Sequence, residues 1–209
     1  MAAKESATVE LFKKKATVVS AKIVEVKDLA EAMAYALDIC EQKEACELLF
    51  TGCEQNLSPN AAGVCERAAT KMIAAPGLGK KDFAVLEKQG KEKGFTVIRE
   101  GMRGYLSGVD VGFVVADMGI AETGTCIVPS ESEDVRLATM ICEINVIALP
   151  KSAIVNSLYD TEKYLNKALQ KDAVYNAYIT GPSRTADIER VLTLGVHGPL
   201  ELHVALMEG

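Results

Sequence analysis

Short apolar runs alternate with amphipathic segments along most of this chain, and this alternation limits its possible folds more than any other feature. Residues 19–26 alternate apolar and polar side chains, as a strand with one buried face does. Residues 28–40 carry apolar side chains at helical spacing, and Asp28 and Glu31 form a capping-box pattern at their start. Strands separated by helices of this length predict a mostly parallel sheet covered on both faces, which is a three-layer α/β/α fold.

The same alternation continues to the end of the chain. Further strands are predicted at 45–51, 71–75, 95–99, 126–128, 145–149, 178–180 and 202–207. Further helices are predicted at 61–70, 81–93, 132–143 and 152–169, with a short one beginning near Ala186. Residues 109–116 are apolar apart from Asp110 and Gly112, and they fit either a buried strand or a tightly packed helix.

The composition fits one folded domain and argues against several classes of protein. The chain has 209 residues, of which 49% are apolar, so we expect an N-terminal surface helix or arm at 1–18 and a single α/β domain at 19–209. The net charge of −6 argues against a general nucleic-acid binder. Neither a membrane span nor a signal-peptide core is visible, which predicts a cytoplasmic protein.

The six cysteines are spaced too widely to form a Cys-x-x-Cys pair. Zinc and iron–sulfur sites usually take two ligands from one tight turn, so the sequence predicts buried free thiols, no metal and no tightly held cofactor. The spacing leaves one alternative open, a loosely built metal site from four cysteines: Cys40, Cys46, Cys53 and Cys65.

A dense group of candidate functional residues follows the predicted strand 178–180. The candidate anion-binding residues here are Gly181, Ser183, Arg184, Thr185 and Asp187. Arg184 can hold a carboxylate or phosphate with both arms of its guanidinium. The carboxyl end of a strand and the N-terminus of the helix predicted near Ala186 would both favour an anion there. In the alternative, Ser183 or Thr185 caps that helix, and Arg184 pairs with Asp187 or Glu189.

A second candidate group lies in the run G-I-A-E-T-G-T at 119–125. Glu122 follows an apolar segment and precedes a glycine turn, where it could act as a nucleophile or as a general acid–base. Thr123, Gly124 and Thr125 complete the candidate anion-binding set. In the alternative, Glu122 is buried and accepts hydrogen bonds from the backbone amides of its own turn.

Two smaller groups complete the candidates. His197 lies in a glycine-bounded turn and is a candidate proton carrier, whereas His203 on the last predicted strand is expected to be structural. Arg103 and Tyr105, in the glycine-rich segment 101–108, could close over a ligand or form a simple connector. The chain has no Walker loop, no Gly-x-Gly-x-x-Gly and no Gly-x-Ser-x-Gly, which argues against ATP hydrolysis, conventional NAD binding and serine hydrolysis.

Two of these motifs resemble a known family. G-P-S-R-T-A-D-I-E at 181–189, G-V-H-G-P at 195–199 and the terminal L-H-V strand resemble the C-terminal signature of the lactate-utilisation protein C family, or LUD domain. The run at 119–125 resembles that family's other hallmark. Two separate motifs in the family's order argue against chance agreement. One departure is the short lead-in before the first predicted strand.

The resemblance implies both a fold and a function. The fold would be similar to the sugar-phosphate isomerase and CoA-transferase superfold (NagB/RpiA/CoA-transferase-like). The function would be that of a non-cluster subunit in a cytoplasmic L-lactate oxidation system, which binds a small carboxylate or partner iron–sulfur subunits. The alternative is a stand-alone enzyme acting on a phosphorylated sugar or an acyl-CoA, with Glu122 at its centre. Activity of the isolated chain and self-association into a homo-oligomer stay open.

Overall fold

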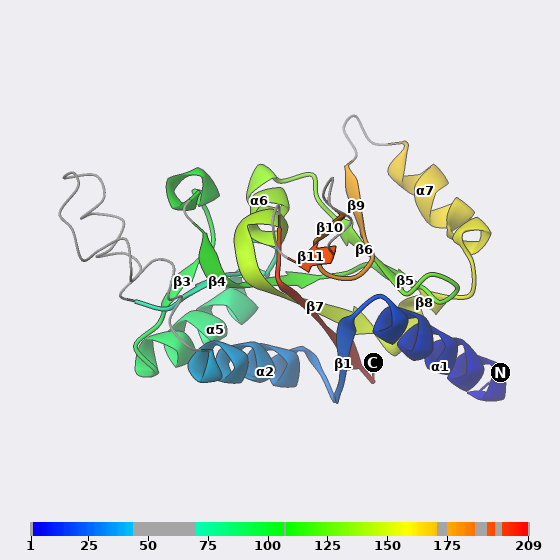
Figure 1. The fold of residues 1–209 in the computed structure, drawn as a ribbon, viewed down its shortest axis with the longest axis horizontal. Coiled ribbons are helices and arrows are strands. Elements are labelled where there is room, and N and C mark those ends of the chain that lie inside the picture. Colours follow the sequence, from blue (N-terminus) through cyan, green and yellow to red (C-terminus); the bar gives the residue numbers. More distant parts are fainter. Residues whose placement is uncertain are drawn as a thin grey trace.

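A sheet of six parallel strands forms the centre of the computed structural model of this chain (Figure 1). Its order is β1-β12-β7-β4-β2-β3. The strands are β1 (Ala21–Val26), β2 (Met72–Ala74), β3 (Thr96–Ile98), β4 (Val109–Val115), β7 (Cys142–Pro150) and β12 (Glu201–Met207). The predicted mostly parallel α/β fold is therefore confirmed, and 109–116 is a strand rather than a helix.

The structure describes residues 2–43, 70–106, 108–170, 175–186, 192–194 and 198–208. The strand predicted at 45–51 and nearly all of the helix predicted at 61–70 lie outside these residues. No helix within the described ranges is both long and apolar enough to cross a membrane.

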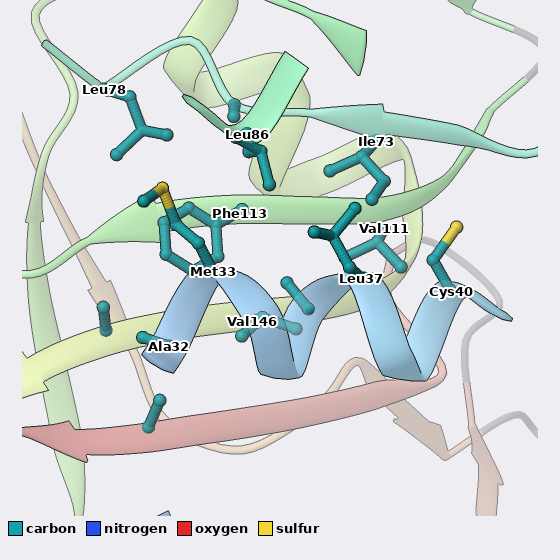
Figure 2. Packing of buried hydrophobic residues seen from close by; sticks show 14 of the residues in the cluster. Ala32, Met33, Leu37, Cys40, Ile73, Leu78, Leu86, Val111, Phe113 and Val146 are labelled. Carbon is teal, nitrogen blue, oxygen red and sulfur yellow. The ribbon is translucent and has the colours of Figure 1, made fainter. Parts of the chain in front are cut away.

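Helices cover both faces of the central sheet. Figure 1 shows α2 (Leu29–Gln42) and α5 (Lys80–Glu92) on one side and α6 (Glu133–Ile141) on the other. The Asp28 carboxylate caps α2 as predicted, by accepting a 3.0 Å hydrogen bond from the N–H of Glu31. Figure 2 shows side chains of α2 packed on those of three strands: Met33, Leu37 and Cys40 on Ile73, Val111, Phe113 and Val146. Burying a leucine or a phenylalanine in such a core contributes about 1.5–3 kcal/mol.

The N-terminal helix α1 (Ala2–Val18) packs on the same face as α6. Val9, Phe12 and Ala16 recur at helical spacing and are buried, the last two completely. They share a hydrophobic cluster with Val114 of β4 and Leu149 of β7. The helix that was expected at the surface thus contributes three side chains to the core.

A second sheet lies over part of this face, and the sequence did not reveal it. Its order is β8-β5-β6-β9. The strands are β5 (Met118–Ile120), β6 (Thr125–Pro129), β8 (Ile154–Val155) and β9 (Asn176–Ile179). β6 is antiparallel to both β5 and β9, and β8 is parallel to β5. The strand predicted at 178–180 therefore belongs to this mixed sheet and not to the parallel one.

The single long helix predicted at 152–169 is wrong. The segment contains a 3₁₀ turn, β8, a second 3₁₀ turn and the short helix α7 (Glu162–Ala168). β-Branched side chains favour a strand, and Ile154 and Val155 pair with β5 of the second sheet. Ser157 and Asp160 then form a capping box that begins the next turn. Pairing with a distant strand and a local cap together interrupt the helix.

Candidate functional site

The turn between β5 and β6 carries Glu122, and its side chain is exposed. The carboxylate oxygen Oε1 accepts a 2.8 Å hydrogen bond from the N–H of Leu158. The N–H of Glu122 donates to the carbonyl of Asn156 at 3.0 Å. The expectation of a buried Glu122 bonded to amides of its own turn is wrong, because its partners come from the segment that follows β8. A carboxylate held in this way is open to a ligand or a partner.

Gly124 fixes the same turn against α1. Its φ of +67° is left-handed, and a β-carbon at this position would lie 2.4 Å from the backbone nitrogen of Ala16. Only glycine combines this backbone conformation with so close an approach. Helix α1 therefore forms one wall of the turn that carries Glu122.

Three threonine hydroxyls connect the two sequence motifs. The Oγ1 atom of Thr125 lies 2.7 Å from Oγ1 of Thr123 and 2.6 Å from Oγ1 of Thr180. Thr125 is buried, whereas Thr123 and Thr180 are exposed. Thr180 stands directly before the C-terminal motif, so the two motifs meet at this chain of hydroxyls. Sequence reasoning did not select Thr180, although it ends a predicted strand beside the motif.

The first part of the C-terminal motif is well packed. Gly181 and Pro182 are buried, and the N–H of Ser183 donates a 3.0 Å hydrogen bond to the carbonyl of Pro199. A β-carbon on Gly198 would lie 3.1 Å from the β-carbon of Ser183. The two ends of the predicted signature therefore lie against each other.

The helix predicted near Ala186 is wrong at its start. Residues Arg184–Ala186 form β10, which pairs antiparallel with β11 (Leu192–Leu194). Because Ala186 lies in a strand, no helix begins there, and the predicted anion site loses that part of its support. The side chains of Arg184 and Thr185, and the whole of Asp187 and His197, lie outside what the structure describes. Their roles stay predictions.

A pocket of about 190 Å³ lies beside the buried Gly181 and Pro182. Its other lining residues are Arg136, Thr139 and Met140 of α6, Asn145 of β7, Tyr175, Ala177 and Ile179 on or next to β9, and Pro199 and Leu202 near β12. Sequence reasoning missed Arg136 and Asn145. A signal for Asn145 was present, because it is the one polar residue in the apolar run 144–149.

His203 bridges α2 and β12. Its Nδ1 atom lies 2.9 Å from the Tyr35 hydroxyl, and its Nε2 atom lies 2.8 Å from a carboxylate oxygen of Glu201. Burial lowers the pKa of His203, and the neighbouring Glu201 only partly opposes this effect. A neutral, buried imidazole with both nitrogens partnered suits a structural bridge.

The described cysteines are inert. Cys40, Cys126 and Cys142 are buried, and burial raises the pKa of each thiol to about 12. Within the described ranges, no three His, Cys, Asp or Glu side chains gather closely enough to hold a metal ion. The four-cysteine alternative stays untested, because Cys46, Cys53 and Cys65 lie outside those ranges.

The glycine-rich segment 101–108 is tied to α6 at Arg103. The Arg103 guanidinium donates hydrogen bonds to both carboxylate oxygens of Glu133, at 2.7 and 2.8 Å. The N–H of Met102 also donates to the Asp134 carboxylate at 2.8 Å. In this arrangement Arg103 holds a connector in place, and it is not among the described residues that line the pocket beside Gly181 and Pro182.

The sequence model of the LUD domain matches residues 9–207. The chain belongs to the LUD domain family. Among curated relatives of this LUD domain, "Lactate utilization protein C" of Geobacillus thermodenitrificans (strain NG80-2) is 34% identical over 95 residues, which are 44% of this chain and 40% of that protein. "Lactate utilization protein C 1" of Bacillus mycoides (strain KBAB4) is 32% identical over 99 residues, which are 46% of this chain and 42% of that protein.

The matched segments span less than half of these curated relatives. A crystal structure of a DUF162 family protein from Deinococcus radiodurans covers 97% of the LUD chain and 98% of its own, with a TM-score of 0.59 and 16% identity. That likeness shows a shared fold. The resemblance inferred from the two motifs is thus confirmed, whereas the likeness to the sugar-phosphate isomerase and CoA-transferase superfold stays a prediction.

Proposed function

We propose that this LUD domain protein takes part in lactate utilisation, as a non-cluster subunit of a cytoplasmic lactate-oxidising system. The observation that supports this most is the family match across residues 9–207. Relatives named "Lactate utilization protein C" point to the same process. The matched segments span about 40% of those relatives, so the proposed role is inferred from that shared segment alone.

The turn between β5 and β6 is the proposed contact for a partner iron–sulfur subunit. Glu122 and Thr123 are exposed there, and the Leu158 amide holds the carboxylate in one position. An oriented, accessible carboxylate beside hydroxyls suits recognition of a polar partner surface. Ser183, Arg184, Thr185 and Asp187 remain the proposed anion-binding group, and His197 remains the proposed proton carrier.

Growth of the native host tests the role. A strain without the gene should fail to grow on L-lactate as sole carbon source, should grow normally on glucose, and should be rescued by the wild-type gene. Tagged protein from lactate-grown cells should copurify with iron–sulfur subunits. Normal growth of the deletion strain on lactate would rule the role out.

Glu122→Gln tests the proposed contact within the same strain. Because Glu122 is exposed, the change should alter the free energy of unfolding by no more than about 0.5 kcal/mol. We expect weaker recovery of the iron–sulfur subunits and slower growth on lactate. Glu92→Gln is the matched control, because it removes an exposed carboxylate at the end of α5. If both variants restore growth on lactate equally well, Glu122 is not part of the proposed contact.

The exposed Glu122 carboxylate also keeps a second candidate function open, a stand-alone enzyme acting on an acyl-CoA or a phosphorylated sugar. An accessible carboxylate can serve as a covalent nucleophile. Turnover of such a substrate by the isolated chain, lost in Glu122→Gln, would favour this function over the subunit role.

A further inference from the structure

We infer that the pocket between α6, β7 and β9 binds a small carboxylic acid that carries a hydroxyl or an amine beside its carboxyl group. Glu122 is not among the described residues that line this pocket. The pocket is defined by its own geometry, so it does not depend on the proposed role in lactate utilisation. Three features of its wall indicate this chemistry.

The first feature is the side chain of Asn145. It is 1% exposed, and within the described structure its Oδ1 atom has no hydrogen-bond partner. Buried polar atoms are nearly always partnered, because losing water without gaining a hydrogen bond costs free energy. Asn145 lines the pocket, although its Oδ1 atom is itself buried. A small rotation of the side chain would turn this atom toward a bound O–H or N–H group, which would provide the missing donor. A water molecule could do the same, and the binding experiment separates these two cases.

The second feature is the guanidinium of Arg136. Its Nη1 atom donates to the backbone carbonyls of Ser130 and Glu131, and its Cζ atom lies 5.1 Å from the centre of the Tyr175 ring. These contacts hold the planar group in place against the pocket wall. Among the described lining residues Arg136 is the one charged side chain, so the pocket favours an anion. A fixed guanidinium fork matches the two oxygens of a carboxylate.

The third feature is the size and the apolar lining of the pocket. Its volume of about 190 Å³ is below the roughly 300–1,000 Å³ of pockets for drug-sized ligands. Cavities of about 150 Å³ hold molecules the size of benzene, with about six non-hydrogen atoms. Met140, Ile179 and Leu202 provide surface for a short alkyl group. A 2-hydroxy or 2-amino acid of about three to five carbons combines the carboxylate, the donor and the alkyl group in one molecule.

Calorimetric titration with matched acids tests the site. L-Lactate and L-alanine carry the carboxylate and the donor, propionate lacks the donor, and lactamide lacks the charge. We expect L-lactate or L-alanine to bind at least about tenfold more tightly than propionate and lactamide, which corresponds to about 1.4 kcal/mol. No binding of either acid at tens of millimolar, or equal affinity for propionate, would overturn the assignment.

Substitutions locate the site within the molecule. Asn145→Leu keeps the branched shape of the side chain and removes the acceptor, so it should weaken binding of the preferred acid about tenfold and leave propionate unchanged. Arg136→Lys keeps the charge and loses the fork, so it should weaken both acids. Arg136 is only partly buried, which protects this second variant from misfolding. Arg103→Lys is the matched control, because Arg103 pairs with Glu133 and does not line the pocket.

The two hypotheses can fail separately. If Asn145→Leu and Arg136→Lys both bind like the wild type and like Arg103→Lys, the pocket is not the site, whatever the growth experiments show. If the deletion strain grows normally on lactate while the two variants lose acid binding, the pocket is confirmed as the acid-binding site and the proposed role in lactate utilisation is wrong.

Discussion

At the scale of single residues, Gly124 joins a family motif to the N-terminal helix, and we predict that Gly124→Ala destabilises the protein by about 2–5 kcal/mol. A left-handed backbone costs a non-glycine residue about 1–2 kcal/mol, and the contact with the Ala16 backbone adds about 1–3 kcal/mol of overpacking. Urea denaturation measures the loss. Gly94→Ala is the control: Gly94 has a φ of +78° and nothing within 4 Å of its β-carbon position, so only the backbone cost should appear. Equal losses in both variants would show that α1 does not press on the turn.

Glu122 and Asn145 show which properties of a single residue can be predicted from the sequence and which cannot. The motifs selected Glu122 as a candidate reactive side chain but did not predict its exposure, because the amide that holds it belongs to Leu158. Nothing in the run 119–125 reveals a partner so far along the chain. Asn145 is the opposite case, since a lone amide in an apolar run is visible in the sequence and marks a polar atom that must be buried.

At the scale of elements, α1 is the part whose contribution is least evident from its sequence, and we predict that Phe12→Ala lowers the free energy of unfolding by about 3–5 kcal/mol. Phe12 is completely buried in a cluster with sheet residues, so the change leaves a cavity. Val18→Ala on the same helix, at a side chain that is 70% exposed, should change stability by no more than about 0.5 kcal/mol. Similar small effects of both substitutions would favour an arm that packs weakly on residues 19–209.

Elements with a regular local pattern were predictable, and those made by distant pairing were not. The helix predicted at 81–93 is α5, Lys80–Glu92, because its amphipathic spacing is a property of the segment itself. Ile154–Val155 and Arg184–Ala186 became strands because β5 and β11 pair with them. Such pairing leaves no periodic signal in either segment alone, so tertiary contacts override the local helix pattern there.

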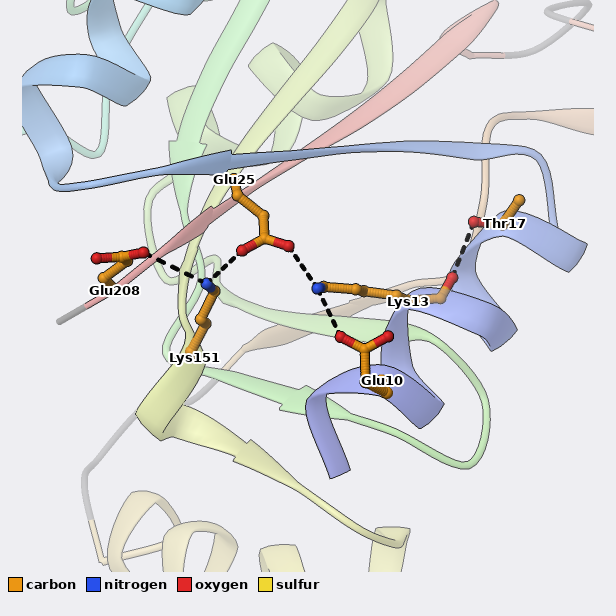
Figure 3. A network of polar contacts seen from close by, with 6 residues as sticks. All are labelled: Glu10, Lys13, Thr17, Glu25, Lys151 and Glu208. Carbon is orange, nitrogen blue, oxygen red and sulfur yellow. Dashed lines mark hydrogen bonds and ion pairs between the residues drawn. The ribbon is translucent and has the colours of Figure 1, made fainter. Parts of the chain in front are cut away.

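At the scale of the whole molecule, a network of charges joins four distant parts of the chain (Figure 3). Lys13 of α1 pairs with Glu10 and with Glu25 of β1, and Lys151, directly after β7, pairs with Glu25 and with Glu208, directly after β12. Glu25 stands at the centre, because it is bound by both lysines. The network thus links α1 to the ends of three neighbouring strands, which no local sequence pattern indicates.

Glu25 should therefore make stability depend on acid pH. Hydrogen bonds from Lys13 and Lys151 lower its pKa from 4.5 to about 2, so its contribution is complete above about pH 4.5 and is lost as the pH falls toward 2. The side chain is 48% exposed, and solvent screening limits the contribution to about 0.5–1 kcal/mol. We predict that Glu25→Gln is less stable than the wild type by this amount at pH 6.5, and that the difference shrinks steadily between pH 4.5 and pH 2.5. Urea denaturation across this range measures it, with Glu92→Gln as the control for loss of an exposed carboxylate. A difference that stays constant across the range, or one no larger than that of Glu92→Gln at pH 6.5, would show that the network does not stabilise the fold.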